Sequence, residues 1–184
     1  MKKRLFIALP LPYGFHDTLS GLQDKIRHLG KMKLVEPDNV HLTLKFLGNV
    51  EVDKIPDIEK ALAPIREYKK FELRVYGLGA FPNNKRPRVI WLGVEKGVDE
   101  IASIHEKISS EMIKVGFTAD KRFHPHYTLA RVKYLNNKLG LREILVKNRE
   151  QVFGEYTVER ITLMESHLSP KGPAYTVLGD FRLS

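Results

Sequence analysis

One short pattern occurs twice in this chain, and it constrains the fold more than any other feature. His41-Leu42-Thr43-Leu44 and His126-Tyr127-Thr128-Leu129 share the form His-x-Thr-x, with a hydrophobic residue at both x positions. The copies lie 85 positions apart (126 − 41) in a chain of 184 residues, and each lies in sequence that alternates like a β-strand. This spacing predicts two similarly built halves, each presenting one copy across a pseudo-twofold axis.

The rest of the sequence mixes strand-like and helix-like stretches without a linker rich in Gly, Ser or Pro. Apolar runs and alternation predict strands over residues 4–9, 40–46, 71–76, 88–94, 126–132, 156–164 and 174–183. Apolar residues at helical spacing predict helices over 15–29, 53–67, 98–115 and 139–147, with Gly30 and Gly116 ending two of them. Adjacent strand pairs favour antiparallel pairing, so we expect an α+β fold over one domain, 1–184, instead of a doubly wound parallel sheet.

Several classes of protein are excluded by what the sequence lacks. No run of about 18 apolar residues is present, so no spanning helix is expected. The start is charged and then apolar, like a secretion signal, but Pro10 and Pro12 follow a short apolar stretch, so we predict a strand and a cytoplasmic protein. The absence of cysteine excludes disulfides, thiol nucleophiles and Cys-ligated metals. No Gly-rich nucleotide-binding motif is found, so no cofactor is indicated.

The charge balance leaves two explanations open. The chain has 31 Lys+Arg against 22 Asp+Glu, a net charge of +9 and a pI near 9.6. Such a balance fits a polyanionic partner such as nucleic acid, or excess lysine that only keeps the protein soluble. Abundant charged residues beside only two glutamines, Gln23 and Gln151, favour a heat-adapted protein.

The first motif predicts a polar face backed by a hydrophobic one. In a strand, residues two apart share a face, so His41 and Thr43 point one way while Leu42, Leu44 and Phe46 point into the core. An imidazole and a hydroxyl side by side are costly on a buried face without partners, but they suit a wet groove.

The second motif repeats this arrangement with His126 and Thr128, and two such strands place two imidazoles and two hydroxyls around one volume. A neutral ring can take a proton from a nucleophile while a protonated ring gives one to the leaving group. Threonine hydroxyls can donate to phosphate oxygens. The pattern therefore predicts cleavage of a phosphoester, or its reversal, without a metal.

Two longer segments carry a resemblance to a known family. His41-Leu42-Thr43-Leu44-Lys45-Phe46-Leu47-Gly48 and His124-Pro125-His126-Tyr127-Thr128-Leu129-Ala130-Arg131 closely resemble the paired signatures of the 2H phosphoesterases. Residues 4–9 and 86–94 are also similar to one branch, the RNA 2′,3′-cyclic phosphodiesterases, long called 2′-5′ RNA ligases. The resemblance covers nearly the whole chain and departs at no motif position.

This resemblance implies a bilobal α+β fold, with antiparallel sheets flanking a central groove, helices outside and one motif in each lobe. It implies metal-free hydrolysis of a 2′,3′-cyclic phosphate on RNA to a 2′-phosphate, with His41 as proton donor and His126 as proton acceptor. The residues alone leave that assignment open, because a near-symmetric site lets either histidine play either part. We expect a monomer without an obligate protein partner, acting on RNA ends such as those of tRNA fragments.

Three other functions remain open. The reverse reaction, with a 5′-hydroxyl in place of water, would join RNA ends through a 2′-5′ bond. A non-catalytic RNA-binding module would use a basic groove alone, although binding does not need a matched acid and base. A metal site at His124 and His126 has too few ligands, so we expect His124 at the rim of the site.

Several charged and aromatic residues are further candidates. Arg131 ends the second signature and would bind phosphate, but alternation places it opposite His126 unless the strand bulges. Lys45 has the same parity as His41 and is expected in the groove or in solvent. Lys85, Arg86 and Arg88 lie in one loop that either contacts an RNA backbone or only faces water. The aromatic residues Phe81, Trp91 and Tyr127 either stack on bases or belong to the core.

Overall fold

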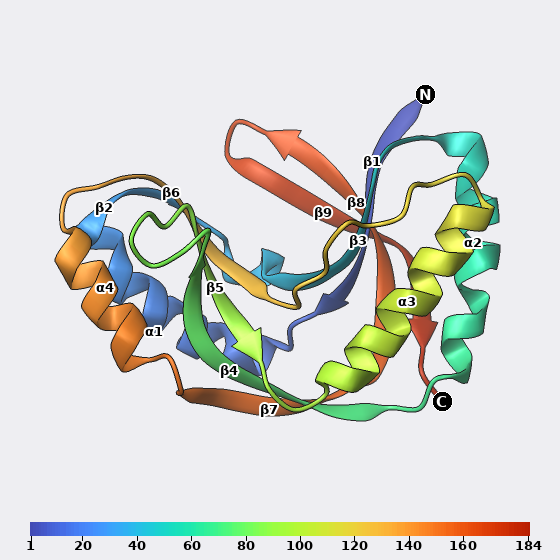
Figure 1. The fold of residues 1–184 in the computed structure, drawn as a ribbon. Helices are drawn as coiled ribbons and strands as arrows, with labels where there is room; N and C mark the ends of the chain where they lie inside the picture. Colours follow the sequence, from blue (N-terminus) through green and yellow to red (C-terminus); the bar gives the residue numbers. More distant parts are fainter.

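The computed structural model describes all 184 residues and contains nine strands and four α-helices (Figure 1). The strands are β1 (Lys2–Pro10), β2 (Gly30–Leu34), β3 (His41–Glu51), β4 (Phe71–Phe81), β5 (Val89–Val94), β6 (Tyr127–Leu135), β7 (Val152–Val158), β8 (Arg160–Ser169) and β9 (Gly172–Arg182). The helices are α1 (His16–Ile26), α2 (Ile55–Leu62), α3 (Val98–Lys114) and α4 (Lys138–Lys147). Short 3₁₀ turns flank α1 and α2, so both are shorter than predicted. None of the helices has both the length and the apolar character needed to cross a membrane.

All nine strands form one antiparallel sheet in the order β7-β4-β5-β6-β3-β1-β8-β9, with β2 also paired to β6. Strands β3 and β6 share a single residue pair, so the sheet is narrowest where two extensively paired halves meet. Two separate sheets were expected, but this one residue pair joins them into a single sheet. The predicted α+β fold with two pseudo-symmetric halves is confirmed.

Most elements of the first half recur in the second half at the spacing of the two motifs. A shift of 85 positions carries β1 onto β5, α1 onto α3, β3 onto β6, α2 onto α4 and β4 onto β8, within four residues of their bounds. The internal repeat therefore extends far beyond the His-x-Thr segments. It includes both helices that each half contributes.

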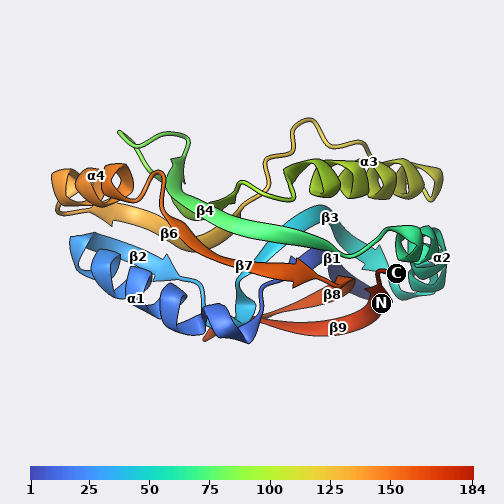
Figure 2. The same cartoon turned by 90° about the horizontal axis from the view of Figure 1, so that it is seen from below.

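The two halves exchange one helix each. Helix α1 packs against β6, although β6 belongs to the second half of the chain, and α3 packs against β3 of the first half. Figure 2 shows α1 beside β2 and β6 at one end of the molecule, and α3 beside α2 at the other end. Each lobe is thus covered by a helix from the other half of the chain, and one cluster of 37 buried residues serves as the core.

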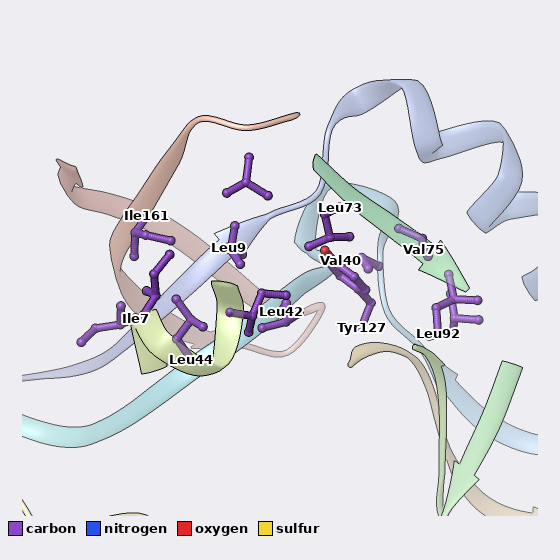
Figure 3. Close-up of a cluster of buried hydrophobic side chains, with 14 of the residues drawn as sticks. Ile7, Leu9, Val40, Leu42, Leu44, Leu73, Val75, Leu92, Tyr127 and Ile161 are labelled. Carbon is purple, nitrogen blue, oxygen red and sulfur yellow. The ribbon is translucent and has the colours of Figure 1, made fainter. Parts of the chain in front are cut away.

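The core reaches directly beneath the two motifs (Figure 3). Leu42 and Tyr127 are 0% exposed and Leu44 is 2% exposed, which confirms that these residues point inward. Of the predicted apolar stripe of α3, Ile101, Ile104, Ile108 and Met112 are fully buried, and Val115, just beyond the end of the helix, is partly buried. Burial of such side chains contributes about 1.5–3 kcal/mol each, so α3 is firmly attached beneath the strand that carries the first motif.

Two strand predictions were wrong in detail. The predicted strand 156–164 is two strands, because the chain breaks at Glu159 and passes from β7, paired with β4, to β8, paired with β1. No Gly or Pro marks this break, so alternation alone runs straight through it. The sequence also did not predict β2, which starts at Gly30; a Cβ there would lie 2.2 Å from the backbone oxygen of Tyr134, so the close approach to β6 requires glycine.

Candidate active site

The two motifs meet at the single residue pair that joins β3 and β6. Leu42 lies opposite Tyr127 in an antiparallel register, and both side chains point into the core. The hydroxyl of Tyr127 forms a 2.7 Å hydrogen bond with that of Tyr156 below the sheet. The buried Tyr127 is thus tied by its hydroxyl to β7, on the core side of the sheet.

The histidines and threonines of the motifs flank this crossing, on the face of the sheet opposite to that of Leu42 and Tyr127. Because side chains alternate along each strand, His41 and Thr43 share a face, and so do His126 and Thr128. The antiparallel register places His41 next to Thr128 and Thr43 next to His126. The structure therefore brings all four predicted side chains together around the pseudo-twofold axis.

The ring of His41 is fixed by two hydrogen bonds and two aromatic neighbours. Its Nδ1 lies 2.7 Å from the backbone oxygen of Asn39, and its Nε2 lies 3.0 Å from Oγ1 of Thr43. Phe6 stacks on the imidazole with ring centres 4.8 Å apart, and Tyr175 of β9 meets it edge-on at 5.3 Å. Neither Phe6 nor Tyr175 was predicted as a site residue, because neither lies within a motif.

The ring of His126 has a closely similar environment in the other lobe. Its Nδ1 lies 2.6 Å from the backbone oxygen of His124, the counterpart of Asn39 at the 85-residue spacing. Phe81 meets the ring edge-on with centres 5.0 Å apart, and Trp91 lies 6.5 Å away. His124 therefore acts here through its main chain, while Phe81 and Trp91 are partly buried at the edge of the site.

These contacts set the same tautomer in both rings. A carbonyl oxygen only accepts, so Nδ1 carries the proton in His41 and in His126. In the neutral rings, both Nε2 atoms are therefore acceptors. That of His41 receives the hydroxyl proton of Thr43. Each ring thus has the same nitrogen available for proton transfer.

Burial and nearby positive charge keep both rings neutral in the free protein. Burial is the main cause that lowers the pKa of His41; the bond to the Asn39 carbonyl opposes it, and the charges of His126 and Arg131 lower the pKa further. Burial also lowers the pKa of His126, against its carbonyl bond and together with the charges of His124 and Arg131. A negatively charged ligand would reverse the effect of these charges.

A β-bulge lies at the last residue of each motif. Leu44 is unpaired in the ladder between β3 and β1, and Leu129 is unpaired in the ladder between β6 and β5. One extra residue reverses the alternation beyond it. Face assignments from simple alternation therefore hold as far as Leu44 and Leu129 and fail beyond them.

Two predictions are corrected by the first bulge. Phe46 was expected in the core, but it is 58% exposed and its ring lies 5.8 Å from that of Phe6, on the side of His41. Lys45 was expected in the groove or in solvent, but only 3% of it is exposed, on the core side of β3. The bulge at Leu44 exchanges the faces of these two residues.

The second bulge brings Arg131 to the motif face. Arg131 is exposed, and its charge lowers the pKa of His41 and of His126. Burial raises the pKa of Tyr175, and the charge of Arg131 opposes that effect. These influences reach groups of both lobes, as expected for a residue on the face that carries the motifs. A phosphate-binding role for Arg131 required a bulge between His126 and Arg131, and the structure has one at Leu129.

A buried glutamine supports the second bulge. Gln23 of α1 is 4% exposed, and its Nε2 donates to the backbone oxygens of Val35 at 2.6 Å and of Leu129 at 3.2 Å. The backbone N–H of Val35 also donates to Leu129, at 2.9 Å. The sequence offered one signal for this role, since Gln23 is one of only two glutamines in the chain.

The basic loop between β4 and β5 starts at the site. Phe81, which contacts His126, precedes it, and Oδ1 of Asn83 accepts the backbone N–H groups of Lys85 and Arg86 at 3.0 Å each. Lys85, Arg86 and Arg88 are all exposed. The turn thus holds three exposed positive charges shortly after the residue that contacts His126.

A pocket of about 560 Å³ lies beside His124, two residues before His126, and extends across β5 and β4. His124, Pro125 and Trp91 line its near end, and Arg149 lines it as well. A Cβ on Gly79 would lie 2.4 Å from the Trp91 ring, so glycine is what lets the indole lie against β4. Nowhere in the molecule do three or more His, Asp and Glu side chains gather as a metal site would require.

A family model and curated relatives match the chain over almost its whole length. The model of the LigT-like phosphoesterases matches twice, over residues 9–91 and 92–175, so each match contains one motif. The RNA 2′,3′-cyclic phosphodiesterase of Methanothermobacter thermautotrophicus is 37% identical over 185 residues, covering 100% of both chains. That of Aeropyrum pernix is 40% identical over 166 residues, covering 89% of this chain and 94% of the relative.

Solved structures share the fold. A protein of Thermus thermophilus superposes with a TM-score of 0.83 at 33% identity, covering 98% of this chain and 97% of the other. Escherichia coli LigT complexed with 3′-AMP gives 0.82 at 26% identity, covering 100% and 99%. From the duplicated family match, the full-length relatives and the paired motifs at one crossing, it follows that this chain belongs to the LigT-like phosphoesterase family.

Proposed function

We propose that the chain is a metal-independent RNA 2′,3′-cyclic phosphodiesterase that hydrolyses cyclic phosphate ends to 2′-phosphomonoesters. The observation that carries this proposal is the crossing at Leu42 and Tyr127, because it sets two imidazoles and two hydroxyls on one face. Two imidazoles supply both proton transfers that the reaction needs, without a metal-bound hydroxide. Membership of a phosphoesterase family and relatives named for this activity support it.

In the proposed reaction, water attacks phosphorus and the bond from phosphorus to the ribose O3′ breaks. Nε2 of neutral His126 accepts the water proton, and Nε2 of protonated His41 donates a proton to the departing O3′. The bond to O2′ remains, so the product is a 2′-phosphate, and proton exchange with solvent restores both rings. The donor and acceptor roles follow the resemblance to the 2H phosphoesterases, because the near-symmetric geometry allows the reverse.

The substrate itself supplies the charge that the donor needs. Burial and neighbouring cations lower the pKa of His41, so it is neutral near pH 7 in the free protein. A cyclic phosphate carries one negative charge, and its arrival favours the protonated ring. Binding therefore loads the proton donor, and the carbonyl bond at Nδ1 stabilises the resulting cation.

Three side chains would hold the phosphate. Thr43 and Thr128 face the groove beside the histidines and donate hydrogen bonds to its non-bridging oxygens. Arg131, exposed on the face that carries the motifs, adds a cationic fork suited to phosphate. The hydroxyl of Thr43, which bonds Nε2 of His41 in the free protein, would turn to the phosphate when that nitrogen becomes protonated.

The basic loop gives the positive charge a role in binding RNA. Lys85, Arg86 and Arg88 lie in the turn that follows Phe81, whose ring contacts that of His126. Contacts from such a loop to the phosphate backbone would be independent of sequence and weakened by salt. The net charge of +9 would then favour encounter with an RNA end.

Product analysis tests the proposal directly. An oligonucleotide ending in a 2′,3′-cyclic phosphate is incubated with the protein in EDTA, and the products are separated as 2′- and 3′-phosphates. We expect a 2′-phosphate at a rate that EDTA does not change. An unchanged cyclic end, a 3′-phosphate, or activity restored only by added zinc would refute the proposal.

Ligation is a second candidate, favoured by the pocket beside His124 and Trp91. It lies on the side where water is activated, so it could hold the nucleoside whose 5′-hydroxyl replaces water. Cleaved tRNA halves with a cyclic phosphate and a 5′-hydroxyl would then give a longer RNA joined by a 2′-5′ bond. Filling the pocket by Val98→Trp, at an exposed residue of its lining, would reduce ligation and leave hydrolysis unaffected; equal loss of both would contradict this use of the pocket.

A further inference from the structure

Lys45 is a buried lysine in an unusual position. The bulge at Leu44 turns it to the core side of β3, where 1% of its side chain is exposed. Its Nζ lies 2.9 Å from the backbone oxygen of Thr118 and 3.0 Å from Oδ2 of Asp120. Lysines are rarely buried, and an apolar residue of similar size often stabilises such a position equally well. Stability alone is therefore a poor explanation for this pair.

The segment that Lys45 holds leads to the second motif. Residues 117–126 connect α3 to β6 and contain no helix or strand. From Thr118 to His126 they make no backbone–backbone hydrogen bond, so side chains must fix their path. The two main-chain oxygens that do accept a bond are those of Thr118, from Lys45, and of His124, from the ring of His126.

A second side chain, that of His105, contacts two residues of this segment. Nε2 of His105 on α3 lies 3.1 Å from the same Oδ2 of Asp120, and its ring stacks on Phe123 with centres 3.8 Å apart and planes 3° apart. Phe123 immediately precedes His124, whose oxygen orients His126. A continuous series of contacts thus runs from the strand of the first motif to the imidazole of the second.

We propose that Lys45 is a positioning residue that fixes the His124 carbonyl through this connecting segment, and so holds His126 in its Nδ1–H tautomer. Lys45 lies four residues after His41 on the same strand, so the contact also sets one histidine relative to the other. The expected effect of Lys45 on the reaction rate rests on the proposed two-histidine reaction. Its effect on the His126 tautomer is independent of that reaction.

Substitution Lys45→Met keeps the side chain long and buried and removes its hydrogen bonds. We expect kcat on a 2′,3′-cyclic nucleotide to fall about 10- to 100-fold, because a small displacement of a catalytic group has an effect of this size. KM is expected to change less than about threefold, since the phosphate ligands remain. In ¹⁵N-histidine NMR spectra of the free protein, the Nδ1–H form of His126 is expected to lose population.

Lys3→Met is the matched control. Lys3 forms a 2.8 Å ion pair with Glu165, with 28% and 10% of the two side chains exposed, and it lies outside the segment. This variant loses a partly buried ion pair but should keep the wild-type kcat and His126 spectrum. The same loss in both variants would show a general effect of destabilisation and would overturn the proposal.

Two milder variants keep the test decisive if Lys45→Met does not fold. Asp120→Asn keeps an acceptor for both Lys45 and His105, and His105→Phe keeps the stacking on Phe123 but loses the bond to Asp120. Both should shift the His126 tautomer and lower kcat less than Lys45→Met. Folded variants with wild-type kcat and an unchanged His126 spectrum would overturn the proposal. If the wild-type protein cleaves no cyclic phosphate, the proposed function fails while the NMR result still decides the role of Lys45.

Discussion

Replacing Arg131 by methionine should change both the rate of the reaction and its pH dependence. Arg131 lies on the face that carries both motifs, and its charge lowers the pKa of His41 and of His126. It is also the only one of the three proposed phosphate ligands that carries a charge. Arg131→Met therefore removes a hydrogen bond to the substrate and a positive charge near both rings.

The expected loss follows from the exposure of Arg131. A hydrogen bond involving a charged group contributes about 1.5–3 kcal/mol, and solvent screening at an exposed site favours the lower end. A loss of about 1.5–2 kcal/mol corresponds to a fall of about 10- to 30-fold in kcat/KM. In the same variant both histidines should bind protons more readily, so both limbs of the curve of kcat/KM against pH move to higher pH.

The assay measures initial rates on a 2′,3′-cyclic nucleotide between about pH 5 and 9 for three variants. Arg131→Lys keeps the charge without the planar fork. Its kcat/KM should fall less than that of Arg131→Met, and both limbs of its pH curve should stay at the wild-type pH. Arg142→Met removes an exposed arginine from α4 and should change neither. If Arg131→Met keeps the wild-type kcat/KM, or loses it without moving either limb, the placement of this charge near both histidines is wrong.

The remaining predictions concern the motifs, stability and the basic loop. His41→Ala and His126→Ala should each abolish turnover of a cyclic nucleotide with the fold intact by circular dichroism; near-normal turnover by either would exclude the two-histidine mechanism. Thr43→Val and Thr128→Val should each reduce kcat about 10²–10³-fold, as expected for one preorganised donor, and an effect below about threefold would remove them from the site. The pKa of both histidines is lower in the folded protein than in the unfolded chain, so below about pH 6.5 the unfolded chain takes up protons that the native state does not. The free energy of unfolding should therefore decrease as the pH falls from about 6.5 through the folded pKa values. Urea unfolding at pH 7 and pH 5 measures this difference, and equal stabilities would contradict it. Replacing the three cations of the loop 82–88 by serine should weaken RNA binding at low salt and flatten its salt dependence, whereas an unchanged slope would mean that the loop only faces water.

Strand alternation was sufficient to identify the four motif side chains, because the crossing lies where β3 and β6 are still regular. The same reasoning failed a few residues further on, at Phe46 and Lys45, because each strand bulges directly after its threonine. One bulge is supported by Gln23, more than 100 residues away in the sequence. Periodicity reports the local chain and contains no information about such a distant partner.

The duplication could be recognised from two four-residue segments, since equal spacing of the same pattern is unusual. The exchange of α1 and α3 between the lobes could not, because an amphipathic helix shows that it has a buried face and not which strands cover it. The role of the segment 117–126 was also missed. Its path depends on Lys45 and His105, which the sequence presents as an ordinary lysine and an ordinary structural histidine.

The helix exchange has a consequence for how this protein is made. When the first half of the chain leaves the ribosome, β3 and its motif are present, but α3, which covers the other face of β3, has not been synthesised. The apolar residues beneath His41 therefore stay exposed until at least Lys114 has emerged. Folding must then close both lobes together, so a truncated product would expose hydrophobic surface instead of forming a half-active enzyme.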